Sequence, residues 1–255
     1  MAINEIKRKI LQVAHKSGEG HLGSSFSILD ILYVLYSKVM NVSPINLDSE
    51  DRDFLILSKG HASLAHSAIL NDQGFINDEQ FYSYCSHESI LGGHLSRCKV
   101  PGVEASTGSL GHGISMSIGI ALASKIKRIE NKIFVIAGDG EINEGTFWEA
   151  MLLGSHHNLD NLYCIVDYNR SNDRALKLDP LDDKLRGMGW DVTAINGHSH
   201  SEIYEALTKS NNDRPNAIIA NTVKGKGIKE MENNPAWHHR MPNAEELESM
   251  LEELK

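Results

Sequence analysis

The chain has 255 residues, 41% of them hydrophobic, so it can bury a substantial core and lies near the upper size of a single domain. Its formal net charge of −9 and its scattered basic residues argue against a nucleic-acid surface, which needs clustered Lys and Arg. No apolar run approaches the roughly 18 residues of a membrane span, and the N-terminus lacks the apolar core of a secretion signal. We therefore expect a soluble, cytoplasmic protein, and the odd, unclustered cysteines (Cys85, Cys98 and Cys164) suit that reducing compartment.

Helix and strand patterns alternate along the chain, without a long linker or a repeat. In chain order, we expect a helix at 4–17, a second helix at 27–40 whose nearly continuous apolar surface indicates burial, and a strand at 53–58. A helix unusually rich in small residues follows at 111–125, and then a strand at 132–138. Small residues favour close packing of this helix, either within the domain or near a dimer interface.

The second half continues the alternation. Strands are expected at 161–167, 190–195 and 216–223, because these runs are short, apolar and partly β-branched. Such runs are typical of strands buried on both faces of a parallel sheet. The fold class that follows is α/β, with a parallel central sheet and helices on both faces.

Two helices in this half have additional signals. Ser199 and Glu202 form a plausible capping box for a helix over 201–210. The segment 243–255 places four apolar side chains on one face, so this last helix should dock by that stripe. The four side chains are Leu247, Met250, Leu251 and Leu254.

A carboxylate and an amide follow two of the expected strands. Asp139 stands between Gly138 and Gly140 after one strand, and Asn169 ends the next strand thirty positions later. Residues beyond the carboxyl ends of parallel strands converge on one crevice, and this oxygen pair suits Mg²⁺ or Ca²⁺. The two glycines would let a diphosphate approach the backbone. A bare Gly-Asp-Gly is also typical of an ordinary turn; the properly spaced Asn169 favours the metal interpretation.

This pair resembles the thiamin diphosphate motif, and the wider sequence resembles the transketolases. The segments that carry the resemblance are GEGHLGSS (18–25), LSKGHAS (57–63), GGHLSRCKVPGVEASTGSLGHGIS (92–115), GDGEINEGTFWEA (138–150) and VKGKGIKEMENNPAWHHRMPN (223–243). They occur in the family's order along almost the whole chain. The resemblance implies a thiamin diphosphate-binding fold, with residues 1–255 as a single domain that corresponds to the N-terminal, diphosphate-binding domain of transketolase.

The resemblance also implies roles for particular residues. Asp139 and Asn169 would be metal ligands through their side chains, and Ser171 through its backbone carbonyl. His61 and His238 would face the diphosphate and the reacting end, while His21 and His94 would contact hydroxyls of the donor. Neutral imidazoles suit this work because ketose cleavage moves a hydroxyl proton. The cofactor-binding residues implied are His61, Gly108, Leu110, Gly138, Asp139, Gly140, Glu144, Asn169 and His238.

Other histidines are expected to have ordinary surface or core roles. These are His15, His66, His87, His156, His157, His198, His200 and His239. A zinc site made of Cys85, His87, His94 and Cys98 is disfavoured, because its spacing matches no usual structural zinc pattern.

Glu144 and Glu149 are either solvated carboxylates at a helix start or, as the resemblance implies, interface residues that link two cofactor sites. Three features depart from the family pattern: Ser109, His112 and the short loop after Asn169, which should border the site entrance. These departures leave open whether the substrate is a specialised sugar.

The glutamate that activates the cofactor belongs to the pyrimidine-binding domain, which this sequence lacks. The resemblance therefore implies the N-terminal subunit of a split transketolase that moves a two-carbon ketol unit from a ketose (phosphate) donor to an aldose acceptor. Its partner would be a C-terminal subunit, in an α2β2 assembly. Two alternatives stay open: a subunit of another thiamin diphosphate enzyme, such as a deoxyxylulose phosphate synthase-like one, and a non-catalytic diphosphate-binding module.

Overall fold

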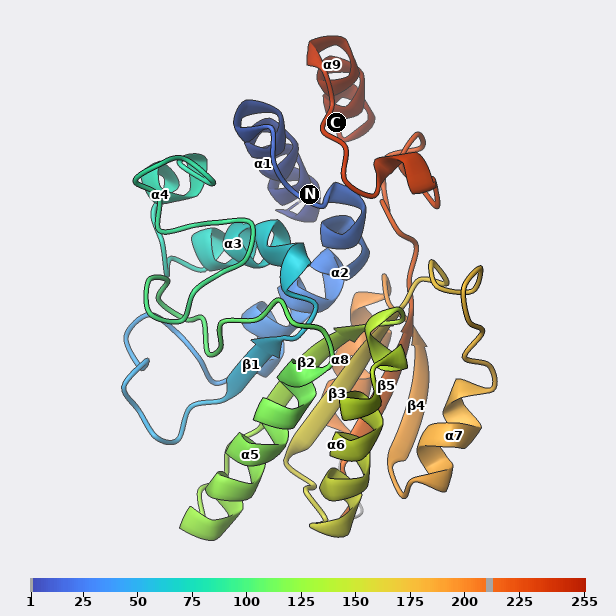
Figure 1. Cartoon of the computed structure of the whole chain (residues 1–255). Coiled ribbons are helices and arrows are strands. Elements are labelled where there is room, and N and C mark those ends of the chain that lie inside the picture. Colours follow the sequence, from blue (N-terminus) through green and yellow to red (C-terminus); the bar gives the residue numbers. More distant parts are fainter. Residues whose placement is uncertain (1, 210–212) are drawn as a thin grey trace.

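A computed structural model describes residues 2–209 and 213–255. Within these residues five strands form one parallel sheet in the order β1-β2-β3-β5-β4 (Figure 1). The strands are β1 (Phe54–Leu57), β2 (Ile133–Gly138), β3 (Leu162–Tyr168), β4 (Asp191–Asn196) and β5 (Asn216–Asn221). All five expected strands are present, so the predicted parallel α/β fold is confirmed.

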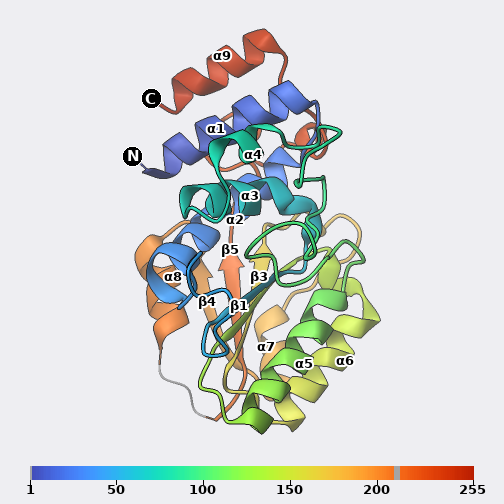
Figure 2. The same ribbon diagram turned by 90° about the vertical axis from the view of Figure 1, so that its left-hand side faces the viewer.

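Helices cover both faces of this sheet (Figure 2). One face carries α5 (His112–Lys127), α6 (Gly145–His156) and α7 (Leu181–Gly187); the other side carries α1 (Ala2–Ser17), α2 (Leu22–Val34), α3 (Ser63–Asp72), α4 (Asp78–Tyr82), α8 (His200–Thr208) and α9 (Ala244–Glu253). Successive side chains of a strand enter different cores: Phe134 and Ile136 join the α1–α2–α3 side, whereas Val135 packs with α5 and α6. This alternation explains why the strands are apolar at every position.

Helix α2 begins earlier than expected. It starts at Leu22 rather than residue 27 and continues into a π-helical turn, Leu35–Val39. The glycines and serines near its start give no apolar period, so the sequence did not show where the helix begins. A Cβ at Gly23 would lie 3.2 Å from Lys224 Cγ, so the start of α2 is in close contact with the 224 segment.

The expectation that no segment could span a membrane by length and apolarity was wrong. Among the described residues, Leu22–Val39 is long and apolar enough, with a mean hydropathy of 1.2 over 18 residues. That window is 78% buried inside the protein, as in the core helix of a globular domain. Its apolarity is thus explained by packing between helices.

Two other expectations are met with changes. Ser199 Oγ accepts a hydrogen bond from Glu202 N at 3.4 Å, but the Glu202 carboxylate accepts from Asn196 N instead of closing the expected box. Ser210, the last residue of that expected helix, lies outside the described residues.

On α9 the expected stripe docks: Met250 and Leu254 are buried, and Leu247 and Leu251 pack against the core.

Because the strands are parallel, their carboxyl ends open at one edge of the sheet. The segments that leave this edge begin at Ser58 after β1, Asp139 after β2, Asn169 after β3 and Thr222 after β5. The start of α2 and the 3₁₀ turn Pro235–Trp237 are linked to this edge through Lys224. The candidate site is built here.

Candidate cofactor site at the carboxyl edge of the sheet

Asp139, Asn169 and Ser171 come together at this edge. Asp139 Oδ1 accepts hydrogen bonds from Gly140 N at 2.8 Å and Ser171 Oγ at 3.1 Å, and Asp139 Oδ2 accepts from Asn172 N at 3.2 Å. Asn169 Oδ1 accepts from Ser171 N at 3.1 Å. Both strand-end side chains are buried. The three residues predicted as metal ligands, Asp139, Asn169 and Ser171, are thus neighbours, and we term this group the metal corner.

The surroundings of Asp139 fit a cation. Its carboxylate is 3% exposed, and no ion pair reaches it from the described residues. The charge of Lys224 acts on Asp139 without forming an ion pair, and a bound divalent cation would compensate this buried carboxylate more fully. Carboxylate, amide and carbonyl oxygens are also the donors that Mg²⁺ prefers. Residues 138–140 and 169–171 could therefore hold a metal together with phosphate oxygens.

Asp167 orients Asn169. Its buried carboxylate accepts hydrogen bonds from Asn169 Nδ2 at 3.0 Å, from the hydroxyls of Ser27 and Thr222, and from Lys59 Nζ in an ion pair. Burial opposes the charge of Asp167, but Lys59 and the hydroxyl donors outweigh it, so the pKa of this carboxyl lies below its ordinary value. Since Nδ2 faces Asp167, Oδ1 of Asn169 faces the metal corner.

Glu141 plays a similar part for the backbone. Its carboxylate accepts from Gly138 N at 3.0 Å, from Gly111 N at 2.9 Å and from the Ser58 hydroxyl. Burial raises its pKa despite these bonds. Glu141 thus joins the Gly-Asp-Gly turn to the loop before α5 and to the end of β1.

That loop carries the predicted contacts Gly108 and Leu110. Gly108 has φ 156°, and a Cβ there would lie 3.1 Å from His94 Cδ2, so the loop and His94 are in direct contact. At Gly111, with φ 80°, a Cβ would lie 2.7 Å from Glu144 Cβ. The predicted residue Glu144 therefore lies under this loop at the start of α6, with its side chain exposed.

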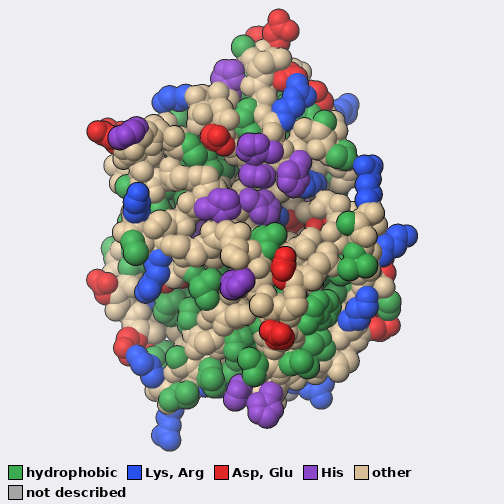
Figure 3. Space-filling view, in the orientation of Figure 1, with side chains coloured by type: hydrophobic (Ala, Val, Ile, Leu, Met, Phe, Trp, Pro, Cys, Tyr) green, Lys and Arg blue, Asp and Glu red, His purple; other side chains and the backbone are tan. Residues whose placement is uncertain are grey.

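Several histidine side chains gather on one face of the molecule (Figure 3). The ring of His21 lies 5.2 Å from that of His61 and 5.6 Å from that of His238. His94 joins them, because Cβ atoms built at Gly60 and Gly108 would lie 3.0 and 3.1 Å from its ring. The four predicted catalytic histidines, which come from separate segments, are thus brought into one group.

His239, expected to have an ordinary role, belongs to this group as well. Its ring centroid lies 4.6 Å from that of His21, and its Nε2 lies 3.5 Å from Glu19 Oε2. In the sequence, the one indication that His239 lies near the other histidines is that it directly follows His238. Together with His21, His61, His94 and His238 it defines what we term the histidine cluster.

Three members of the histidine cluster, His21, His61 and His238, are held neutral near pH 7. Burial lowers the pKa of His61 to about 2, with Lys59 and His21 adding to the shift. Burial, followed by the charges of His239 and His238, lowers the pKa of His21 to about 4. Burial and Lys224 also lower the pKa of His238. Neutral imidazoles can both donate and accept hydrogen bonds, as sugar hydroxyls require.

Lys224 connects the cluster to the metal corner. Its Nζ donates to His238 Nδ1 at 2.9 Å, so neutral His238 carries its proton on Nε2. A cavity of about 610 Å³ is lined by Asn169, Ser171, Lys224 and His238, and by residues of the loop after β3. The expectation that this loop borders the site is confirmed.

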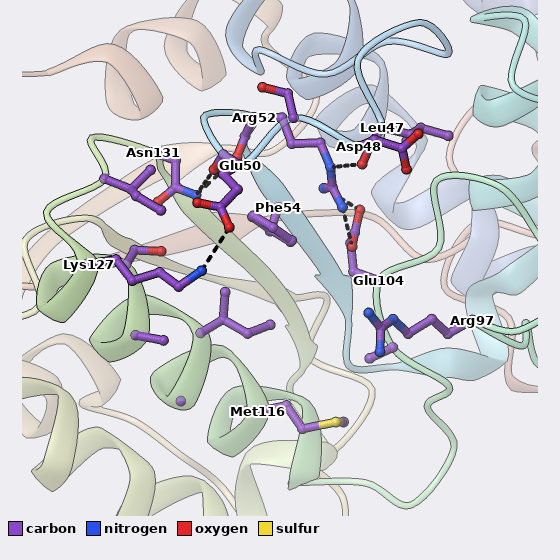
Figure 4. Close-up of a pocket in the computed structure, with 17 residues that line it drawn as sticks. Leu47, Asp48, Glu50, Arg52, Phe54, Arg97, Glu104, Met116, Lys127 and Asn131 are labelled. Atoms are coloured by element: carbon purple, nitrogen blue, oxygen red, sulfur yellow. Dashed lines mark hydrogen bonds and ion pairs between the residues drawn. The ribbon is translucent and has the colours of Figure 1, made fainter.

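A second cavity, of about 640 Å³, lies beside α5 (Figure 4). Arg52 forms a bidentate pair with Glu104 there, and Lys127 Nζ donates to Glu50 Oε1 at 2.9 Å. None of the residues assigned to cofactor or metal lines this cavity. Despite its size, it is separate from the chemistry at the sheet edge.

The zinc alternative is not supported. Within residues 2–209 and 213–255 no three His, Cys, Asp or Glu side chains are arranged to hold a metal ion. Cys85 and Cys98 are free thiols. The metal corner is not a group of this kind, because two of its three predicted ligands are an amide and a backbone carbonyl.

Sequence reasoning missed Asp167, Glu141 and Lys224. Lys224 lies inside one of the segments that carry the family resemblance, so its position could have indicated a role. Glu141 likewise lies inside such a segment, 138–150, whereas Asp167 gave no local signal, because its partner Lys59 is distant in sequence.

These features define the α/β class of thiamin diphosphate-binding folds, and comparisons with known proteins agree. The family described as transketolase, thiamine diphosphate binding domain, matches residues 1–254. The chain is 39% identical to an apulose-4-phosphate transketolase subunit of Actinobacillus succinogenes, over 98% of this chain and 93% of that protein. It is 36% identical to the 6-deoxy-6-sulfo-D-fructose transketolase subunit SqwG of Clostridium sp., over 99% and 94%.

Among solved structures, transketolase from Campylobacter jejuni superimposes with a TM-score of 0.88 at 30% identity, covering 99% of this chain. This chain spans only 41% of that transketolase. The chain belongs to the transketolase family and carries its thiamin diphosphate-binding domain. The predicted family and its thiamin diphosphate cofactor are thereby confirmed. The similarity of the chain to named subunits confirms the prediction of a transketolase subunit.

Proposed function

We propose that the chain is the diphosphate-binding subunit of a two-component transketolase. The observation that carries this proposal is the position of the histidine cluster beside the metal corner at one sheet edge. The metal corner, which could bind a diphosphate, is thereby adjacent to histidines that could form hydrogen bonds with sugar hydroxyls.

In this proposal the side chains of Asp139 and Asn169 and the carbonyl of Ser171 would hold Mg²⁺, whose charge would attract the diphosphate of the cofactor. When bound, thiamin diphosphate supplies the carbon nucleophile of the reaction. The protein binds and orients the cofactor, and the backbone from Gly108 to Leu110 supports its ring end.

The histidines act on the sugar. Nε2–H of His238 is free to donate a hydrogen bond towards the reacting end, because its Nδ1 accepts from Lys224. His61, kept neutral by its lowered pKa, can accept a hydrogen bond from a hydroxyl of the donor at the reacting end. His21 and His94 bind further hydroxyls of the donor. Their contribution is to orient the sugar.

A second polypeptide would complete the site. We propose that it carries the pyrimidine-binding domain with its activating glutamate, and that the two subunits assemble as α2β2 in the cytoplasm. Relatives that match over most of their length are named as transketolase subunits, which supports such a partner. Closure between subunits would also exclude water from the diphosphate and strengthen each polar contact.

The substrates are proposed to be a ketose donor and an aldose acceptor, of which at least one carries an anionic tail. The two relatives are named for a sugar phosphate and a sulfo sugar, which supports specialised sugar metabolism rather than a general pathway.

Reconstitution tests the proposal. Donor-dependent ketol transfer is measured with the purified chain, thiamin diphosphate and Mg²⁺, before and after addition of the candidate partner subunit. We expect transfer only in the mixture. Full activity from the chain alone would falsify the two-component proposal, and cofactor binding by the mixture without ketol transfer would favour a different thiamin diphosphate enzyme.

A further inference from the structure

Two arginines of the loop after β3 line the same cavity as the metal corner. Arg170 and Arg174 face a space of about 610 Å³ together with Asn169, Ser171 and Lys224. They differ in how their charges are used within the protein, and this difference indicates a function for one of them.

Arg170 is fully engaged. Its Nη1 forms ion pairs with Asp179 and, at 3.4 Å, with Asp173. Its guanidinium also stacks on the Tyr168 ring, 4.4 Å from the centroid. Two carboxylates and an aromatic face therefore hold this arginine at the wall of the loop.

Arg174 lacks such partners. In the described part of the chain no hydrogen bond, ion pair or ring contact involves its guanidinium, and its side chain is exposed. It nevertheless lies only three positions after Ser171 and lines the cavity beside the predicted metal ligands. A cation placed at a site without a protein partner is available to an anionic ligand.

The charge of the expected ligand calls for such a group. A diphosphate carries more negative charge than one divalent cation neutralises, and Asp139 already offsets part of that cation. Lys224 is partly occupied with His238. Arginine suits the remaining phosphate oxygens, because its planar fork donates two parallel hydrogen bonds.

We propose that Arg174 binds the diphosphate of the cofactor directly, so that the loop after β3 closes over it opposite Lys224. The inference rests on the proposed function, because it takes thiamin diphosphate as the ligand. The position of Arg174 beside Asn169 and Ser171, rather than beside His94, assigns it to the diphosphate and not to the sugar.

The test compares Arg174→Ala with Lys177→Ala in the assembled two-subunit enzyme. Lys177 is a matched control, because it is an exposed cation of the same loop that does not line the cavity. Calorimetric titration gives the Kd of thiamin diphosphate at saturating Mg²⁺. We expect Arg174→Ala to weaken binding about ten- to hundredfold, as for loss of a charge-assisted pair, and Lys177→Ala to change it less than about threefold.

Two further measurements sharpen the result. Arg174→Lys should recover part of the affinity, since it keeps the charge but loses the bidentate geometry. Inorganic diphosphate with Mg²⁺, titrated as a competitor, should lose affinity for Arg174→Ala in parallel with the cofactor. Added salt should weaken wild-type binding more than binding by Arg174→Ala.

Several results would overturn the inference. They are an unchanged Kd in Arg174→Ala, an equal loss in Lys177→Ala, and an unchanged cofactor Kd with a raised KM for the donor, which would place Arg174 on the substrate. If the wild-type assembly itself binds no thiamin diphosphate, the proposed function fails as well. If the wild type binds thiamin diphosphate normally and Arg174→Ala binds it with the same Kd, only the inference about Arg174 is overturned and the proposed function stands.

Discussion

At the scale of single residues, the metal corner depends on one charge. Asp139 is the only buried carboxylate among the three predicted ligands, and its replacement leaves an amide that compensates a cation poorly. We expect Asp139→Asn to abolish the Mg²⁺ dependence of thiamin diphosphate binding without unfolding the chain. Titrating cofactor at several Mg²⁺ concentrations checks this, with the exposed Asp183→Asn as control. Retained Mg²⁺ dependence in Asp139→Asn contradicts the assignment.

His239 extends the group of histidines that we propose to bind the sugar beyond the four expected ones. Because its ring contacts His21 and its Nε2 approaches Glu19, we expect His239→Ala to raise the KM of the donor while leaving cofactor affinity unchanged. His21→Ala and His94→Ala should reduce ketol transfer more strongly. Steady-state kinetics at saturating cofactor distinguish these effects. An unchanged KM of the donor in His239→Ala would show that His239 does not contribute to donor binding.

The control for these variants has to be chosen from the structure. His15 looked suitable from sequence, yet its Nδ1 bonds to the Pro242 carbonyl at 2.8 Å and so helps to hold the segment that carries His238 and His239. The exposed His87 is a cleaner control. We expect His87→Ala to show wild-type kinetics.

At the scale of elements, His66 joins α3 to the end of α2 and makes stability depend on pH. It is buried and hydrogen-bonded to Tyr36 Oη at 2.8 Å, and burial lowers its pKa to about 4. Unfolded histidine titrates near 6.5, so between about pH 6.5 and 4 the unfolded chain binds a proton that the native chain does not. Stability is therefore full above 6.5 and falls towards pH 4.

The size of this loss is up to about 3 kcal/mol. Denaturant unfolding at pH 7, 6, 5 and 4 measures it in the wild type and in His66→Asn, in which this titration is absent. We expect the variant to be less stable at pH 7 but to lose less stability on acidification. Identical pH slopes in the two proteins contradict the argument.

Two glycines near or within α5 form a second element-scale test. A Cβ at Gly111 would lie 2.5 Å from Thr146 Oγ1, and its φ is 80°, whereas Gly119 has no neighbour within 4 Å. We expect Gly111→Ala to lower the free energy of unfolding by more than about 1 kcal/mol, and Gly119→Ala to raise it by about 0.5–1 kcal/mol. Urea denaturation of both variants checks this; destabilisation by Gly119→Ala and not by Gly111→Ala would reverse the interpretation.

The elements found from sequence were those with a clear period or a continuous apolar run. The five strands are buried on both faces and stand out as apolar segments. Helix α3 was missed because it is buried along most of its length and rich in small residues, so it shows no amphipathic stripe. The short helices α4 and α7 offer too few residues for a period. In the site, residues with distant partners, such as Asp167, could be recognised only from the three-dimensional structure.

At the scale of the whole molecule, cofactor and partner should assist each other. The cavity at the metal corner is open to solvent in the isolated chain, and Gly108 and Ser109 of the ring-end loop are exposed. We expect thiamin diphosphate with Mg²⁺ to tighten association with the partner subunit by the same factor by which the partner tightens cofactor binding. Titrations of each ligand with and without the other measure both factors. Independent binding contradicts a shared site.

The surface has an uneven distribution of apolar side chains. Met116 and Ile126 on α5 and Leu152 and Leu153 on α6 are exposed, which is unusual for one face of a protein that works alone (Figure 3). The two helices start on either side of the Gly-Asp-Gly turn, so anything that covers this face also approaches the cofactor site.

The carboxylate of Asp167 is the point where α2, the end of β1, β3 and the segment after β5 meet. Most substitutions there would lower the amount of folded protein, and any loss of cofactor affinity would be hidden beneath that loss. A survey of variants scored by growth would place Asp167 and Asp139 in the same intolerant class, although one is needed to build the protein and the other is proposed to bind its ligand. Only purified, folded variants assayed one by one would separate the two.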